Sequence, residues 1–266
     1  MRTILLIGIG AGDPDQLTLQ AVRALRRADV FFVLDKGPAA ADLVALRRTI
    51  LDAHLGAGDY RLVQAADPRR DRDRDPGDAA GYGAAVDDWH ARRAELYERM
   101  IEAEVPDDGV GAFLVWGDPS LYDSTLRIID RVVARGTVAF DYEVIPGITS
   151  VQALAARHRV VLNRIGGPVT ITTGRRLAAD GFPPGVDDAV VMLDAGTAFQ
   201  DLDDPDLHIY WGAYLGTDDE MLLSGRVGDI GASIARTRAD ARRRKGWIMD
   251  IYLLRRDPPS PASTTL

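Results

Sequence analysis

The chain opens with an apolar run that leads directly into a glycine-rich turn. The run extends from Arg2 to Ile9, and the turn has the sequence GIGAGDPD. A continuous apolar run, rather than an alternating one, is typical of a strand buried on both faces of a parallel sheet. Residues 17–28 then carry apolar side chains at helical spacing, with Asp15 or Thr18 available as a cap, and residues 29–34 form a second apolar run. This β-α-β pattern predicts an α/β fold with a right-handed crossover.

The strand-to-turn pattern recurs twice further along the chain. VWGDPSLY occupies residues 115–122, and VIPGITS occupies residues 144–150. The carboxyl ends of parallel strands meet at the edge where ligands of α/β proteins bind, and glycines let the backbone approach a ligand closely. We therefore expect the three turns to build one binding site. GIGAGD is not a dinucleotide-binding fingerprint, because Asp13 stands where the third glycine is required.

Composition excludes several classes of function. The sequence of 266 residues has no cysteine, which excludes disulfides, thiolate metal sites and cysteine nucleophiles. Its four histidines fall in separate predicted elements, so we expect no metal site. The net charge of -8 argues against a broad nucleic-acid surface. Neither a cleavable signal nor an apolar run of about 18 residues is present, so we expect a cytoplasmic protein that does not bind membranes.

The length and the element pattern suggest two domains. We predict an N-terminal α/β domain over residues 1–147, which carries the GIGAGD and GDP loops, and a C-terminal α/β domain over residues 148–256. The tail at 257–266 has the composition of a flexible segment, and DPRRDRDRDPGD at 67–78 that of a solvated loop with no assigned role. In the second domain the pattern predicts strands near 169–173, 189–193, 207–214, 221–224 and 246–254, and helices at 151–158 and 231–245.

The order of the three turns resembles that of the tetrapyrrole (corrin and porphyrin) methylases, which use S-adenosylmethionine. IGIGAGDPDQLTLQAVRALRRADV, VWGDPSLY and VIPGITSVQALAARHRVVLN are similar to the three signatures of that family, except that Ala11 stands where proline is usual. WHARRAELYERM, TTGRRL, MLDAGTAFQ, WGAYLG and GWIMDIYLLRR are similar to segments of members that methylate carbon 1 of precorrin-5 and release acetate. The resemblance implies two α/β domains with the cofactor cleft between them, a small tetrapyrrole substrate and a homodimer.

The resemblance also assigns a cofactor site, residue by residue. It implies that S-adenosylmethionine contacts Ile9, Gly117, Asp118, Leu121, Thr149 and Ser150, and that Met192 and Ala213 complete the site from the second domain. Asp118 has an alternative role, because an aspartate at this position can cap a helix that begins near Ser120.

The remaining candidates concern catalysis and substrate binding. Loss of the acetyl group requires a residue that positions or deprotonates water, and Tyr122, Asp123 and His90 are candidates that also have ordinary structural roles. An acidic protein that binds a polycarboxylate needs local cations, and we expect them at Arg164, Arg175 and Arg176 unless these side chains are simply solvated. Alternative functions are methylation of another precorrin, of a protein or of RNA, or cofactor binding without turnover.

Overall fold

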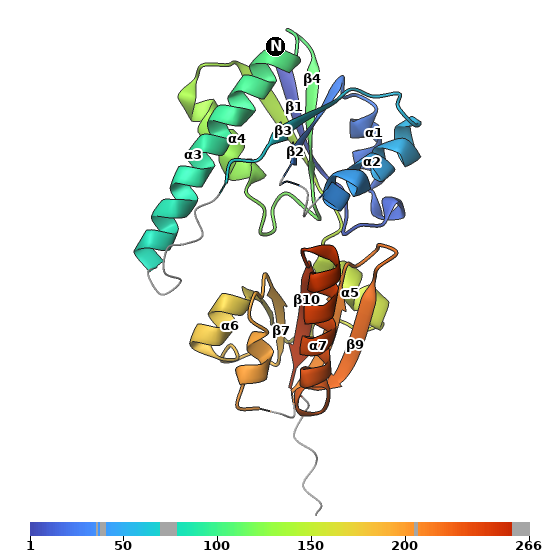
Figure 1. Cartoon of the computed structure of the whole chain (residues 1–266), viewed down its shortest axis with the longest axis vertical. Helices are drawn as coiled ribbons and strands as arrows, with labels where there is room; N and C mark the ends of the chain where they lie inside the picture. Colours follow the sequence, from blue (N-terminus) through green and yellow to red (C-terminus); the bar gives the residue numbers. More distant parts are fainter. Residues whose placement is uncertain (36, 38–40, 70–78, 205–206, 257–266) are drawn as a thin grey trace, which may run out of the picture. The chain divides into compact units, whose positions relative to one another are not determined.

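The structure, a computed structural model, describes residues 1–35, 37, 41–69, 79–204 and 207–256 (Figure 1). The chain divides into two compact units, Met1–Thr149 and Ser150–Leu266. Within the described residues, no helix combines the length and the apolar content that a membrane crossing requires. The predicted tail at 257–266 lies outside the described residues, as do positions 70–78 of the charged insert.

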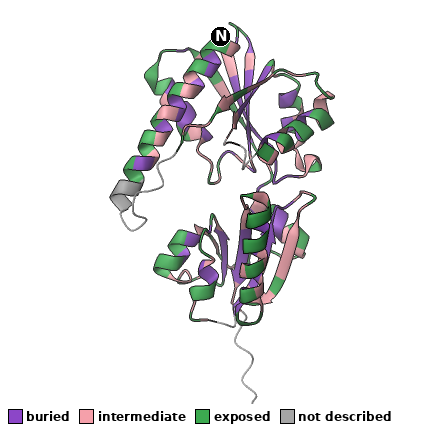
Figure 2. Ribbon diagram, viewed as in Figure 1, coloured by how far each residue is buried: buried purple, intermediate pink, exposed green. Residues whose placement is uncertain are grey.

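The first unit is built on a parallel sheet with the strand order β3-β2-β4-β1-β5. Its strands are β1 (Arg2–Gly8), β2 (Val30–Asp35), β3 (Leu62–Ala66), β4 (Val110–Val115) and β5 (Phe140–Ile145). Its helices are η1 (Pro14–Gln16), α1 (Leu19–Leu25), α2 (Ala41–Leu55), α3 (Ala79–Glu104) and α4 (Thr125–Arg135). The side chains of β1 are fully buried from Ile4 to Ile7, as its continuous apolar sequence predicts (Figure 2).

Helices cover both faces of this sheet, and each face has its own apolar core. The cluster that includes Leu5 and Ile7 packs with α1 and α2, whereas the cluster that includes Ile4 and Leu6 packs with α3 and α4 (Figure 1). Side chains alternate between the faces along a strand, so a doubly covered strand must be apolar at every position. The α/β fold is thereby confirmed for this unit.

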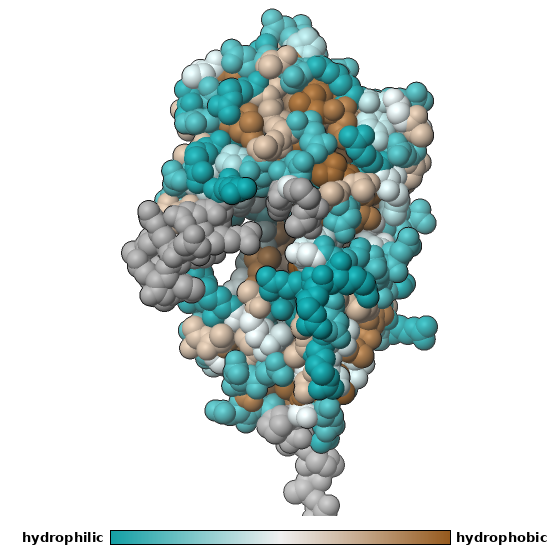
Figure 3. All heavy atoms as spheres, in the orientation of Figure 1, coloured by the Kyte–Doolittle hydropathy of each residue, from teal (hydrophilic) through white to brown (hydrophobic). Residues whose placement is uncertain are grey.

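The second unit contains a mixed sheet with the order β6-β7-β10-β8-β9. Its strands are β6 (Val169–Thr173), β7 (Asp188–Met192), β8 (His208–Ala213), β9 (Met221–Arg226) and β10 (Asp250–Arg255), and its helical segments are α5 (Ser150–His158), α6 (Gly174–Asp180), η3 (Ala198–Asp201) and α7 (Val227–Lys245). The central strand β10 runs antiparallel to both of its neighbours, whereas β6 and β7 are parallel. One side of α7 is buried, and its outer side is hydrophilic (Figure 3).

Several details differ from the sequence prediction. The helix α6 was not predicted, so Arg175 and Arg176 lie within a helix rather than in a turn. The helix α7 begins at Val227 instead of 231, and β10 begins at Asp250 instead of 246 because Gly246 ends α7 with a φ of 80°. Asp67 was predicted to lie in a solvated loop, but its carboxylate is buried in an ion pair with Arg93.

Candidate cofactor and substrate site

The turns after β1, β4 and β5 pack backbone against backbone at the carboxyl edge of the first sheet. A Cβ atom at Gly8 would lie 2.6 Å from the Gly147 nitrogen and 2.9 Å from the Gly117 oxygen. A Cβ atom at Gly147 would lie 2.1 Å from the same Gly117 oxygen. The Gly117 amide also donates to the Gly10 carbonyl at 2.8 Å. Only glycine allows these turns to lie so close together, so the three motifs form one structural feature.

Asp118 joins the second of these turns to the third. One carboxylate oxygen accepts the Gly147 amide at 2.8 Å, and the other accepts the Ser120 amide at 2.8 Å. Burial alone would raise the pKa of Asp118, but the hydrogen bonds from the Ser120 hydroxyl and from the Gly147 and Ser120 amides outweigh burial and lower it. The alternative role as a helix cap is wrong, because the next helix begins only at Thr125.

The other predicted cofactor residues of the first unit lie at the same edge, and Ser150 begins the second unit directly after it. Ile9 is fully buried, and its amide donates to the Val115 carbonyl at 2.9 Å. A Cβ atom at Gly117 would lie 3.7 Å from the Cα atom of Thr149. The Leu121 amide donates to the Asp118 carbonyl at 3.2 Å, and Ser150 follows Thr149 as the first residue of α5.

Met192 and Ala213 end two strands of the second sheet at a common edge. In the register of the sheet, Met192 lies opposite Ile251, and Ala213 lies opposite Asp250. Both strands run antiparallel to β10, so both end beside its first residues. The residues that follow the two strands have left-handed backbone conformations, with φ values of 54° and 50°. The second sheet therefore presents both predicted residues at one edge.

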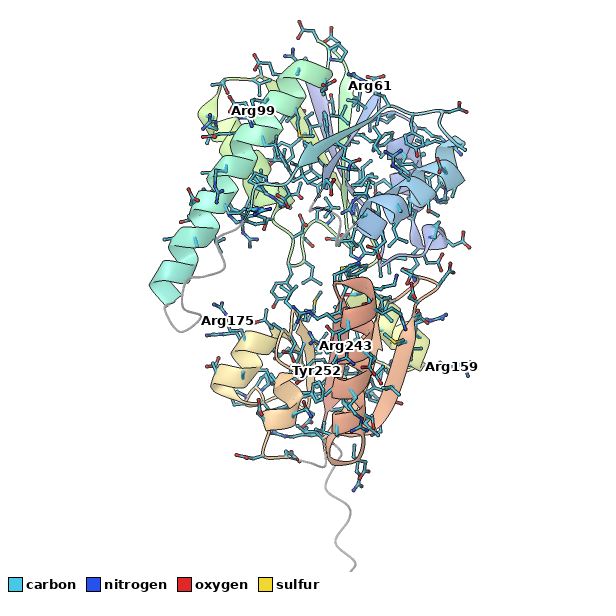
Figure 4. The ribbon with its side chains drawn as sticks, viewed as in Figure 1. Arg61, Arg99, Arg159, Arg175, Arg243 and Tyr252 are labelled. Carbon is cyan, nitrogen blue, oxygen red and sulfur yellow. The ribbon has the colours of Figure 1, made fainter. Side chains whose placement is uncertain are left out.

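A buried polar network that the sequence analysis did not predict holds the turn after Met192. The Asp194 carboxylate accepts the amides of Gly196 at 2.9 Å and Ala198 at 2.8 Å, and the Tyr252 hydroxyl at 2.6 Å. Burial and the neighbouring Asp194 raise the pKa of Tyr252, which lies on β10 (Figure 4). An Asp-x-Gly sequence after a strand signals such a turn, but its partner Tyr252 is 58 positions away.

A buried arginine extends this network to the start of β10. The Arg238 guanidinium donates to the carbonyl of Asp194 and, at 2.8 Å, to the carboxylate of Asp250. Trp211 donates its indole N–H to the same carboxylate at 3.0 Å. Burial raises the pKa of Asp250, although the charge of Arg238 acts in the opposite direction. The network fixes the backbone on both sides of the strand ends that carry Met192 and Ala213.

The three catalytic candidates have different surroundings. Tyr122 is 43% exposed on the loop between β4 and α4 and has a left-handed φ of 50°. The Asp123 carboxylate accepts the amide of Thr125, the first residue of α4, at 2.6 Å. His90 on α3 is 6% exposed, and its Nε2 atom has no hydrogen-bond partner among the described residues.

The environment of His90 favours the neutral form of its ring. Burial lowers the pKa of His90, and the positive charges of Arg131, Arg93 and Arg127 lower it further, with Asp87 acting in the opposite direction. The ring lies 5.2 Å from the ring of Trp89, measured between centroids. A neutral imidazole with a free nitrogen can accept a proton.

The three arginines proposed for substrate binding are not equivalent. Arg164 donates to the carbonyl of Arg256. Arg175 and Arg176 are exposed on α6, where Arg176 lies 3.4 Å from Asp180, and Arg175 extends from the first turn of the helix (Figure 4). Among the described residues, no group of three histidine or acidic side chains could hold a metal ion.

Comparison with known proteins gives consistent matches over most of the chain. The family described as Tetrapyrrole (Corrin/Porphyrin) Methylases matches residues 3–231. The chain is 53% identical over 256 residues to the precorrin-6A synthase (deacetylating) of Sinorhizobium sp, with 96% of each protein covered. A crystal structure of a cobalamin synthesis related protein (CobF) from Corynebacterium diphtheriae has a TM-score of 0.79 and 44% identity, covering 96% of this chain and 98% of that one.

A more distant structure shares the fold. The uroporphyrin-III C-methyl transferase of Thermus thermophilus, solved with S-adenosyl homocysteine, is 18% identical with a TM-score of 0.57, covering 95% of this chain and 96% of that chain. The family match spans both units and includes all three glycine turns. The chain therefore belongs to the tetrapyrrole (corrin/porphyrin) methylase family.

Proposed function

We propose that this chain is an S-adenosylmethionine-dependent C-methyltransferase of cobalamin biosynthesis, which methylates carbon 1 of precorrin-5 and releases acetate to give precorrin-6A. The observation that carries this proposal is the 53% identity to a precorrin-6A synthase (deacetylating) over 96% of both proteins. By comparison, a precorrin-2 C(20)-methyltransferase of Sinorhizobium sp is 30% identical over only 54% of this chain.

The edge of the first sheet is chemically suited to the proposed cofactor. Adenosine and ribose are recognised by backbone donors and acceptors and by close apolar contact, and the glycines at 8, 117 and 147 keep side chains out of this edge. We propose that Ile9, Gly117, Asp118, Leu121, Thr149 and Ser150 contact the cofactor, with Met192 and Ala213 contributing from the second unit. S-adenosylmethionine supplies an electrophilic methyl group, so the protein has to orient the substrate carbon and exclude water.

The release of acetate requires a group that positions or deprotonates water. We propose His90 for this role, because its lowered pKa favours the neutral ring and its Nε2 atom makes no hydrogen bond with a described residue. Asp123 is already engaged at the start of α4. We expect His90→Gln to slow acetate release more than methyl transfer, so that a methylated product which keeps its acetyl group accumulates. If the variant carries out both methyl transfer and acetate release at the wild-type rates, His90 has only a packing role.

The test of the proposed function is incubation with labelled S-adenosylmethionine and a panel of precorrins, followed by mass spectrometry and acetate determination. We expect methylation of precorrin-5 alone, with one acetate released for each methyl group transferred. Turnover of another precorrin would favour a different member of the family. Binding of the cofactor with no methylated product would favour a non-catalytic scaffold.

A second variant tests the cofactor site without substrate. Ser150→Trp places a large side chain beside Thr149, and we expect it to abolish binding of S-adenosylmethionine in calorimetry while the circular dichroism spectrum stays that of the wild type. Normal affinity in this variant would contradict the assignment. We also propose that the protein is cytoplasmic and that it forms a homodimer. Light scattering after size exclusion tests the oligomeric state directly.

A further inference from the structure

Arg47 on α2, a residue of intermediate exposure, differs from three arginines whose side chains are at most 15% exposed. Arg93, Arg238 and Arg255 each form an ion pair with a buried carboxylate, from Asp67, Asp250 and Asp188 respectively. Arg47 has no carboxylate within ion-pair distance among the described residues. Within the part of the chain that the structure describes, its guanidinium donates to two backbone carbonyls, to that of Leu43 at 3.0 Å and to that of Leu114 at 3.4 Å.

The surroundings of Arg47 disfavour its charged form in the absence of a nearby carboxylate. Burial lowers the pKa of Arg47, although the more distant Asp123 carboxylate acts in the opposite direction. The ring of Trp116 lies 5.7 Å from the guanidinium carbon. A guanidinium that is partly removed from water is stabilised by a nearby carboxylate, because the carboxylate replaces part of the lost hydration. The residue as a whole is of intermediate exposure, so a ligand from solvent can reach it.

The position of Arg47 in the fold is one where ligands bind. The ladder between β2 and β4 ends at the pair Phe32–Phe113, whereas the ladder between β1 and β4 continues to the pair Gly8–Val115. After these strands the chain turns to opposite faces, to α2 after β2 and to α4 after β4 (Figure 1). Such a divergence at the carboxyl edge of a parallel sheet is the usual place for a ligand. Arg47 caps the Leu114 carbonyl at this point.

We propose that Arg47 binds a carboxylate of the tetrapyrrole substrate. This inference rests on the proposed function, in which the substrate is a polycarboxylate, and it assigns the first unit a role in substrate recognition. A guanidinium binds a carboxylate through two parallel N–H donors, and its Nη2 atom makes no hydrogen bond with a described residue. The substrate carboxylate would supply a counter-charge that no described residue provides to Arg47.

The test compares Arg47→Gln with Arg48→Gln, which removes the same charge from an exposed position on the same helix. We expect Arg47→Gln to raise the KM for precorrin-5 at least about tenfold, since a partly buried charge contact contributes that much or more. The affinity for S-adenosylmethionine should stay unchanged, and the Tm should not fall by more than about 3 °C, because the substitution breaks no ion pair with a described residue. Arg48→Gln should match the wild type in all three measurements.

Two results would overturn the inference. One is an unchanged KM for precorrin-5 in Arg47→Gln. The other is an equal loss of affinity for cofactor and substrate together with a lower Tm, which would make Arg47 a structural residue. Arg47→Lys separates charge from geometry, because lysine keeps the charge but lacks the paired donors, and we expect a KM between those of the wild type and Arg47→Gln.

A binding measurement distinguishes failure of this inference from failure of the proposed function. If the wild type does not methylate precorrin-5, the proposed function fails, and uroporphyrin then serves as a polycarboxylate probe that is followed by quenching of tryptophan fluorescence. Binding that is at least about tenfold weaker in Arg47→Gln, and that is lost for the methyl ester of uroporphyrin, would still support a carboxylate site. No difference between the wild type and Arg47→Gln, including no binding by either, would reject it.

Discussion

Gly147→Ala is the sharpest test of the glycine-packed edge of the first sheet. The new Cβ atom would lie 2.1 Å from the Gly117 oxygen, whereas ordinary contact begins near 3.4 Å, so the turns after β4 and β5 must separate by about 1.3 Å. The hydrogen bond from the Gly147 amide to Asp118 is stretched by the same movement. Overpacking costs about 1–3 kcal/mol, and a hydrogen bond to a charged group contributes about 1.5–3 kcal/mol. We therefore expect a loss of about 3 kcal/mol, or about 10 °C in the Tm of the first unit.

Calorimetry can measure both consequences on the same sample. We expect the Tm to fall as stated and the Kd for S-adenosylmethionine to rise at least about tenfold, because a shift of about 1 Å at a binding site has large effects. Gly83→Ala is the matched control, since its Cβ atom would meet no atom of the described residues within 4 Å and alanine favours the helix α3. A Gly147→Ala protein with wild-type Tm and Kd would refute the packing argument.

Three further predictions concern charged residues. Asp118→Asn should lower the Tm above the ordinary pKa of an aspartate, about 4, and the difference from the wild type should shrink as the pH falls below it, because the lowered pKa of Asp118 gives stability that is lost as the pH falls through the folded-state value; a constant difference across a pH series of melting curves would contradict this. Asp67→Asn should cost about 3–5 kcal/mol in urea unfolding by leaving Arg93 buried without its partner, and adding Arg93→Met should recover most of the loss. Arg175→Ala with Arg176→Ala should raise the KM for the tetrapyrrole about tenfold and leave cofactor affinity unchanged, whereas equal losses would indicate a folding defect.

Sequence reasoning succeeded where the determining interactions are local. The three glycine turns could be predicted because the residues that make each turn are adjacent in the chain, and parallel strands bring their ends together. Of the two caps predicted for the first helix, Asp15 and Thr18, the structure has Thr18, whose hydroxyl accepts an amide only three residues away, that of Ala21 at 3.0 Å. The continuous apolar runs identified the strands that are covered on both faces.

The features that were missed depend on partners far along the chain. Asp67 belongs by composition to a charged loop, and only Arg93, 26 positions away, makes it a buried residue. The helix α6 begins with a glycine and follows the strand β6 directly. Its seven residues are too few to show a clear helical spacing of apolar side chains. The unusual position of Arg47 depends on where the ladder between β2 and β4 ends, which composition and spacing do not reveal.

The central place of β10 in the second sheet has a consequence for how this protein is made. The strands β7 and β8 leave the ribosome well before β10, yet each needs β10 as its hydrogen-bonded neighbour. Until β10 is synthesised, both strands have an unpaired edge, and the carboxylate that holds Arg238 is missing because Asp250 lies on β10. The first unit, whose strands all precede residue 146, can fold in the meantime. Nascent chains that stop before Asp250 should therefore carry a folded first unit joined to a second that is open to aggregation and to proteases.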